Sequence, residues 1–203
     1  ESLFFCASQS GETFDTLSAL KHVKSKGART AAVVNVMGSS IARLVDKVVL
    51  QGSGPEICVI STKAALSQMV ILTVLAMKLA LKKKAITTKT YNQHMLSLRE
   101  LPGIIQGILN ERSGFIHRLA SKYSNRHNWL YLGRGIYYPI ALEAALKMKE
   151  VAYVHAEGMP GGFLKHGTLA MIDDDVFSIV FVPPPEDKAL YESTLHSIEE
   201  IRA

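Results

Sequence analysis

The sequence has little cysteine and no targeting segment. Its 203 residues include two cysteines, Cys6 within an apolar run and Cys58 in a loop-like segment, and neither lies in a metal-type spacing. A framework of disulfides is therefore not expected, and we predict a reducing, cytoplasmic location. The first residues lack a basic region followed by an apolar run and a cleavage site, so no signal peptide is predicted.

Charge of one sign is not concentrated either. There are 23 Lys and Arg residues against 18 Asp and Glu, a net charge of +5, and the basic residues cluster only at Lys82–Lys84. Such a diffuse excess suits anionic small molecules as well as nucleic acid, and it selects neither class of partner.

Long hydrophobic runs are also scarce, and only Ala64–Leu81 approaches the length of a membrane span. Gln68 and Lys78 interrupt this stretch, and Ala, Met and Leu dominate it as in the interior helices of soluble proteins. We therefore predict a buried helix here rather than a membrane helix.

What is present is an alternation of short apolar runs with helical patterns. The first two apolar runs, Ser2–Ala7 and Ala31–Val36, lie on either side of a stretch with apolar residues at helical spacing. This helical pattern ends before Gly27. A strand, a helix and a strand within about 35 residues predict a βαβ unit with a parallel sheet, and hence an α/β fold. The runs predicted as strands buried on both faces are Ser2–Ala7, Ala31–Val36, Lys47–Leu50, Trp129–Leu132 and Phe177–Val182.

A strand-free region divides the chain. From Thr87 to about Ser124 the pattern is helical, and we expect Pro102 and Gly103 to break it. We predict two α/β domains, residues 1–84 and 85–203. Because the sequence starts inside a strand and stops inside a helix, we expect it to be part of a longer protein.

A polar turn, SQSGET at Ser8–Thr13, follows the first predicted strand. If the strand leads directly into a helix, the free N–H groups and positive dipole end of that helix can bind phosphate, with Ser8, Ser10 and Thr13 adding hydroxyl donors. The alternative is that Ser10 or Thr13 only caps the helix, and the pattern leaves both interpretations open.

The same order of strand, turn and helix recurs near the C-terminus. Ser2–Ala28 and Ser178–Ala203 both show it, but the second turn is Pro183–Glu186. Three prolines offer no backbone N–H, and the glutamate is negative. We therefore predict one phosphate site in the chain.

Three charged residues share one face of the predicted helix at Leu142–Val151. Glu143, Lys147 and Glu150 are spaced by four and then three residues. A surface ion pair is one interpretation. The other is that Glu150 is a general base and Lys147 stabilises an anionic intermediate.

Two further segments are rich in glycine. His155–Gly167 is predicted as a mobile or tightly turned loop, and its spacing of histidine and glutamate matches no standard zinc pattern, so no metal is predicted. In Gly52–Lys63 we expect Ser61 or Thr62 to cap the next helix, with substrate contact as the alternative. The polar residues of the first segment are His155, Glu157, Lys165 and His166.

Four motifs together resemble the isomerase half of the glutamine:fructose-6-phosphate aminotransferases. The resemblance spans nearly the whole chain, and SQSGET alone marks the wider sugar isomerase (SIS) fold. It implies two SIS domains in tandem, both incomplete in this chain. Each would be a three-layer αβα structure with a five-stranded parallel sheet between two layers of helices. The motifs are SQSGET, PEICVISTKA at Pro55–Ala64, GRG with YPIALEAALKMKE within Gly133–Glu150, and LKHG at Leu164–Gly167.

The resemblance also implies a reaction in which fructose 6-phosphate, with ammonia from a glutaminase domain of the same full-length chain, becomes glucosamine 6-phosphate. It implies a homodimer in the cytoplasm, with no cofactor, metal, nucleic acid or membrane, and we expect this chain alone to be inactive. The implied roles are phosphate binding by Ser8, Gln9, Ser10 and Thr13, sugar contact by Val59 and Ser61, proton transfer between C1 and C2 by Glu150 with Lys147 nearby, and ring opening by His166 from the neighbouring subunit.

Two residues depart from the family pattern. Phe163 replaces an acidic residue before LKHG, and Thr168 replaces a proline, which puts the shape of that loop in doubt. Two other functions remain open: an SIS-type glucosamine-6-phosphate deaminase, and a non-catalytic SIS module that senses a sugar phosphate. The sequence upstream of Glu1 would distinguish the deaminase from the aminotransferase, whereas the joint presence of Glu150 and His166 argues against the sensing module.

Overall fold

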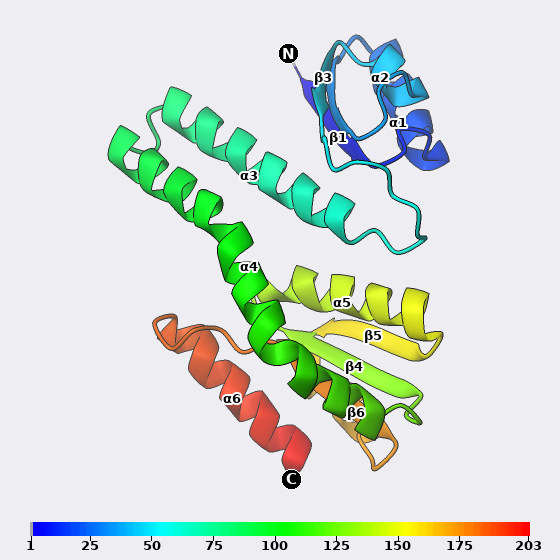
Figure 1. Cartoon of the computed structure of the whole chain (residues 1–203), viewed down its shortest axis with the longest axis vertical. Coiled ribbons are helices and arrows are strands. Elements are labelled where there is room, and N and C mark those ends of the chain that lie inside the picture. The colour runs from blue at the N-terminus through cyan, green and yellow to red at the C-terminus, as the bar shows by residue number, and fades with distance from the viewer. Residues whose placement is uncertain (1) are drawn as a thin grey trace. The chain divides into compact units, whose positions relative to one another are not determined.

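Two parallel three-stranded sheets, one in each of two compact units, form the framework of the protein in this computed structural model, which describes residues 2–203 (Figure 1). The units are Glu1–Asn110 and Glu111–Ala203. The predicted α/β class with parallel sheets is confirmed. The three strands of each described sheet are fewer than the five that the resemblance implied for an SIS domain.

The first unit contains a sheet in the order β1-β2-β3, with parallel pairing throughout. Figure 1 shows α1 and α2 on the same side of this sheet. The core there includes Cys6, Leu20, Val34 and Ile41. The elements are β1 (Leu3–Ser8), α1 (Phe14–Ser25), β2 (Arg29–Val34), α2 (Ser40–Leu44), β3 (Lys47–Leu50) and α3 (Lys63–Lys82).

The outer strand β1 is buried on one face only, and β3 has no buried residue, so the prediction of burial on both faces was wrong for them. Leu3 is 66% exposed, and Phe5, Val48 and Leu50 are exposed as well. An apolar run shows that both faces favour burial, but it does not supply the second layer that would cover them.

Helix α3 occupies the apolar stretch that was predicted to be a buried helix. The helix is confirmed, but its burial is not, because Ala64 is its one buried residue within the part of the chain that the structure describes. Among the described residues α3 is also the one helix long and apolar enough to cross a membrane. Its most apolar 18-residue stretch has a mean hydropathy of 1.9, and 6% of that stretch is buried.

Helix α4 (Thr88–Lys122) runs without interruption through Pro102, so the expected break at Pro102 and Gly103 was wrong. A proline within a helix removes one backbone hydrogen bond, and the bonds on either side of it can still carry the helix onward. The two compact units divide between Asn110 and Glu111, inside α4, and the domain boundary after Lys84 stays a prediction.

The second unit has the strand order β5-β4-β6, again all parallel. The central strand buries residues on both faces: Leu130 and Leu132 pack with Met159 and Leu164, whereas Tyr131 packs with Ala141 and Ala145 of α5. The elements are β4 (Asn128–Gly133), α5 (Tyr137–Ala152), β5 (His155–Pro160), η1 (Gly161–Phe163), η2 (Thr168–Met171), β6 (Val176–Val180) and α6 (Lys188–Arg202).

Strand β5 lies where the sequence predicted the first part of a loop, and that prediction was wrong. Its Gly158 serves packing rather than a turn, because a Cβ there would lie 2.6 Å from Cα of Leu142 in α5. The glycine lets α5 approach the sheet closely.

The two copies of strand, turn and helix predicted at the ends of the chain are β1 with α1 and β6 with α6, as expected.

Candidate functional site

The segment from Ser8 to Thr13 connects the carboxyl end of β1 to the start of α1. Ser8 is buried, and its Oγ accepts a hydrogen bond from the Gly11 N–H at 3.0 Å and lies 3.0 Å from Oγ1 of Thr13. Ser10 Oγ accepts from the Glu12 N–H at 3.2 Å. These bonds fold the segment into a compact loop whose hydroxyls gather at the start of the helix.

Thr13 occupies the N-cap position of α1, but its side chain makes no capping hydrogen bond. Its hydroxyl lies within hydrogen-bonding distance of Ser8 instead, and Ser10 bonds to the loop backbone. The interpretation of these residues as simple caps is therefore wrong. The first N–H groups of α1 lack a side-chain cap from Thr13, which is the arrangement that binds an anion at a helix N-terminus.

Gly11 is required at its position for two reasons. Its φ is +69°, a backbone angle that residues with a side chain rarely adopt. A Cβ at this position would also lie 2.0 Å from Oγ of Ser39. The Gly11 carbonyl also accepts the Ile41 N–H at 3.0 Å. The loop is thereby held against the start of α2.

Glu12 brings a negative charge into a loop that is suited to anions, and the structure directs this charge toward α2. Its Oε1 accepts the Ser40 N–H at 2.7 Å. Hydrogen bonds from the backbone and side chain of Ser40, with the charge of Arg43, lower the pKa of Glu12 below its ordinary value. The carboxylate therefore serves the first turn of α2.

Asn35, which the sequence reasoning missed, links two of the predicted segments. Its N–H donates to the Gln9 carbonyl at 3.1 Å, its Nδ2 donates to the Gly54 carbonyl at 2.7 Å, and its Oδ1 accepts the Ser53 N–H at 3.0 Å. The available signal was a polar residue inside the predicted strand Ala31–Val36, because β2 in fact ends at Val34 and Asn35 lies at the edge of a parallel sheet where ligand-binding loops gather.

The segment between β3 and α3 carries the predicted sugar contacts. Val59 is 87% exposed and Ser61 is partly buried. The expectation that Ser61 or Thr62 caps α3 was wrong, because Thr62 occupies the N-cap without a side-chain hydrogen bond and Oε2 of Glu56 accepts the Ala64 N–H at 3.2 Å.

In the second unit, α5 brings together the three charged residues predicted to share a face. Nζ of Lys147 lies 2.7 Å from Oε2 of Glu150 and 3.4 Å from Oε1 of Glu143. The side chains of Lys147 and Glu150 are 20% and 23% exposed, against 44% for Glu143. The pair is therefore more sheltered than a typical surface ion pair.

The protonation of Lys147 follows from its neighbours. Partial burial acts to lower its pKa, but the hydrogen bond with Glu150 and the charge of Glu143 outweigh this effect and raise the pKa above the ordinary 10.5. Lys147 is consequently a permanent positive charge near neutral pH, suited to stabilising an anion rather than to removing a proton.

The remaining predicted residues follow β5 or belong to it. His155 and Glu157 are exposed residues of the strand itself, and His166 lies in the turn between η1 and η2. The His166 N–H donates to the Phe163 carbonyl at 2.9 Å, and their rings meet edge to face at 5.8 Å. The unusual Phe163 thus contacts the histidine that the family motif singles out.

Comparison with known proteins gives consistent matches. A model described as "SIS domain" matches residues 1–78 and 122–197. The chain is 40% identical over 196 residues to a protein of Caldanaerobacter subterraneus and 43% identical over 197 residues to one of Xylella fastidiosa, each named glutamine–fructose-6-phosphate aminotransferase [isomerizing]. These alignments cover 97% of this chain and 32% of each relative, so the chain spans about a third of their length.

Solved structures agree with these sequence matches. The C-terminal domain of glucosamine-fructose-6-phosphate aminotransferase from Francisella tularensis superimposes with a TM-score of 0.92 at 37% identity, over 99% of this chain and 56% of that one. A putative phosphosugar isomerase from Clostridium difficile gives a TM-score of 0.84 at 22% identity, over 95% and 56%, which supports the fold alone. The resemblance drawn from the four motifs is confirmed.

Proposed function

The chain belongs to the SIS domain family, and we propose that it is the sugar-phosphate isomerase portion of an isomerising glutamine–fructose-6-phosphate aminotransferase. The observation that carries the proposal is the identity of about 40%, over nearly the whole chain, to relatives of that name. In the full-length protein a glutaminase domain supplies ammonia, and the product is glucosamine 6-phosphate.

The loop from Ser8 to Thr13 binds the phosphate of fructose 6-phosphate. The clustered hydroxyls of Ser8, Ser10 and Thr13, the Gln9 side chain and the N-terminus of α1 supply donors without a basic side chain. Val59 and Ser61, on the segment that Asn35 ties to the same edge of the sheet, contact the sugar. A phosphate held far from the reacting carbons fixes their position.

Glu150 moves the proton between C1 and C2, and Lys147 stabilises the negative charge that develops on the enediol-like intermediate. One carboxylate that removes a proton beside a carbonyl and returns it to the next carbon is sufficient for this isomerisation. Support for the assignment comes from the sheltered contact of Lys147 with Glu150. His166 of the partner subunit in a homodimer assists ring opening.

The test is conversion of fructose 6-phosphate to glucose 6-phosphate by the protein as its gene encodes it. Removing a general base lowers kcat by about 100- to 10,000-fold, so Glu150→Gln should do so. Glu143→Gln is the matched control, because Glu143 also pairs with Lys147 from the same helix. If Glu150→Gln left isomerisation unchanged, Glu150 would not be the base. Release of ammonia from glucosamine 6-phosphate by a protein that cannot use glutamine would identify a deaminase instead.

A further inference from the structure

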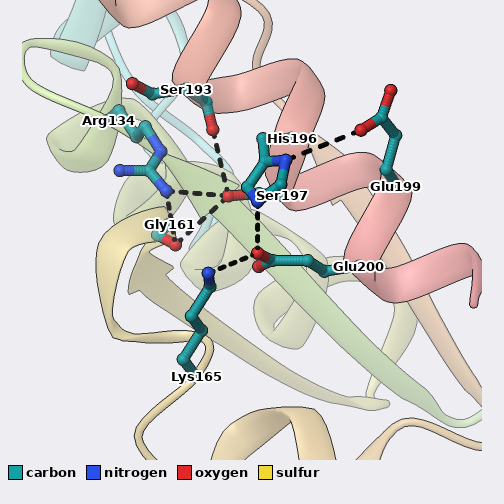
Figure 2. Close-up of polar contacts among 8 residues, drawn as sticks. All are labelled: Arg134, Gly161, Lys165, Ser193, His196, Ser197, Glu199 and Glu200. Atoms are coloured by element: carbon teal, nitrogen blue, oxygen red, sulfur yellow. Dashed lines mark hydrogen bonds and ion pairs between the residues drawn. The ribbon is translucent and has the colours of Figure 1, made fainter.

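Helix α6 is joined to the segment that carries His166 at two points, and neither of these contacts has been given a role above (Figure 2). We propose that Arg134, Ser197 and the ion pair of Lys165 with Glu200 form a clasp that positions Gly161–Gly167. Arg134 and Glu200 are then positioning residues that act through His166, an assignment that rests on the function proposed above.

The first half of the clasp is centred on Arg134, which directly follows β4. Its Nη2 donates to the Gly161 carbonyl at 3.1 Å and to Oγ of Ser197 at 2.8 Å. A Cβ on Gly161 would lie 3.2 Å from Cγ of Arg134, so the glycine allows the arginine side chain to lie directly against the backbone. One guanidinium therefore joins the β4 end, the start of the segment and α6.

Ser197 is the point on α6 that receives this arginine. It is 1% exposed, and its Oγ lies 3.4 Å from the Gly161 carbonyl and 3.3 Å from the Ser193 carbonyl. A hydroxyl has one proton to donate, so Ser197 accepts from Arg134 and donates to one of these two carbonyls. The Ser197 hydroxyl is thus satisfied inside the protein, whereas Nε of Arg134 is buried without a hydrogen-bond partner among the described residues.

The second half lies three residues further along α6. Nζ of Lys165 is 2.7 Å from Oε1 of Glu200, whose side chain is only 16% exposed. Nε2 of His196 lies 3.0 Å from the same oxygen, and Nδ1 of His196 lies 3.6 Å from Glu199 at the rim. Figure 2 shows the Lys165 and Arg134 contacts reaching the same helix from the segment and from β4.

The two attachments bracket most of the segment. Gly161 is held at its start, and Lys165 is held immediately before His166. Gly162 lies between these fixed points, whereas Gly167, at φ +126°, lies beyond them. His166 itself contacts Phe163. Gly167 directly follows His166 and adds backbone freedom on its C-terminal side. The position of His166 is therefore set by the backbone on its N-terminal side, which the clasp holds.

The charge of Glu200 fits this role. The hydrogen bond from Lys165 and the charges of Lys165, His196 and Arg134 lower the pKa of Glu200 below its ordinary value, although partial burial acts to raise it. The carboxylate stays ionised through the neutral range, so the attachment to Lys165 persists there.

The test compares two pairs of variants of the protein as its gene encodes it. Ser197→Ala is matched by Thr194→Ala, since Thr194 is also buried on α6 and also bonds to a carbonyl four residues earlier, but does not contact Arg134. Glu200→Gln is matched by Glu199→Gln, because Glu199 is 77% exposed and does not contact Lys165. Amide hydrogen exchange of Gly161–Gly167 and steady-state isomerisation are measured on each.

We expect Ser197→Ala and Glu200→Gln to speed exchange in Gly161–Gly167 and to lower kcat by about 10- to 100-fold, the loss that follows small misplacement of a reacting group. The dissociation constant of glucitol 6-phosphate, an open-chain analogue that needs no ring opening, should stay unchanged. Both control variants should behave as the parent, and Arg134→Lys, which keeps the charge but loses the planar fork, should fall between parent and Ser197→Ala.

Two results would overturn the inference, and a third would overturn the proposed function instead. Equal exchange in the test and control variants would remove the clasp, whatever the activity. Faster exchange with unchanged kcat would remove the positioning role. A parent protein with no isomerase activity would refute the proposed function and the role of His166 in it, while the exchange data would still decide whether α6 holds the segment.

Discussion

Gly11 and Ser39 are in such close contact that a Cβ on Gly11 would overlap Oγ of Ser39 at 2.0 Å. The contact joins the loop after β1 to the start of α2, and it cannot be inferred from SQSGET, because Ser39 belongs to the turn after the next strand. The loop is therefore fixed by a neighbour as well as by its own hydroxyls.

Gly11→Ala should destabilise the protein more than Gly27→Ala. Both glycines have positive φ, at +69° and +79°, but Gly27 has open space where a Cβ would go. The left-handed backbone alone accounts for a loss of about 1–2 kcal/mol in each variant, and overpacking against Ser39 adds about 1–3 kcal/mol in Gly11→Ala. Urea unfolding measures the difference, and equal losses would show that the contact with Ser39 relaxes freely.

Asn35→Ala should loosen the segment that carries Val59 and Ser61. The variant loses the bonds to Ser53 and Gly54, which together contribute about 1–3 kcal/mol to stability. If this segment contacts the sugar as proposed, KM for fructose 6-phosphate should rise more than kcat falls. Asn110→Ala is the control, since Asn110 makes a side-chain bond within α4 alone. An unchanged KM in Asn35→Ala would separate Asn35 from the binding site.

Glu12 gives a pH dependence with a defined sign. Its pKa is lower in the folded protein than the ordinary 4.5, so the stabilisation by its carboxylate is complete above pH 4.5 and disappears as the pH falls through the folded-state value. The stability difference between the parent and Glu12→Gln should therefore shrink as the pH falls below 4.5. Urea unfolding from pH 3 to pH 7 measures it, with Glu186→Gln to correct for removing one carboxylate. A difference that grew toward low pH would reverse the assignment.

The sequence predicted the strands that are continuous apolar runs, but it missed β5. His155–Pro160 contains a glycine and a proline and alternates too weakly to suggest a strand, yet it pairs in parallel with β4 along its whole length. Its Gly158 is explained by the backbone of α5, a tertiary neighbour. A glycine needed for close packing cannot be distinguished from a turn glycine by local sequence.

The candidate site was predictable where the residues are close in sequence. Glu143, Lys147 and Glu150 lie on one helix, so helical geometry alone brings them together. Asn35 and Ser39 could not be assigned in the same way, because they reach the Ser8–Thr13 loop from the end of the next strand. Residues that support a loop through one or two backbone hydrogen bonds leave no periodic pattern in the sequence.

Replacement of Lys147 should separate its charge from its role in packing. Lys147→Met keeps the length of the side chain but removes the ammonium that contacts Glu150 at 2.7 Å. If that charge stabilises the enediol-like intermediate, kcat should fall by about 100- to 1,000-fold, as when one preorganised donor is lost, with little change in KM. Lys147→Arg retains the charge and should recover part of this loss. Lys149→Met, at an exposed position on the same helix, should leave kcat near that of the parent. Equal kcat values for Lys147→Met and Lys149→Met would show that Lys147 only forms a surface ion pair and that Glu150 acts without its charge.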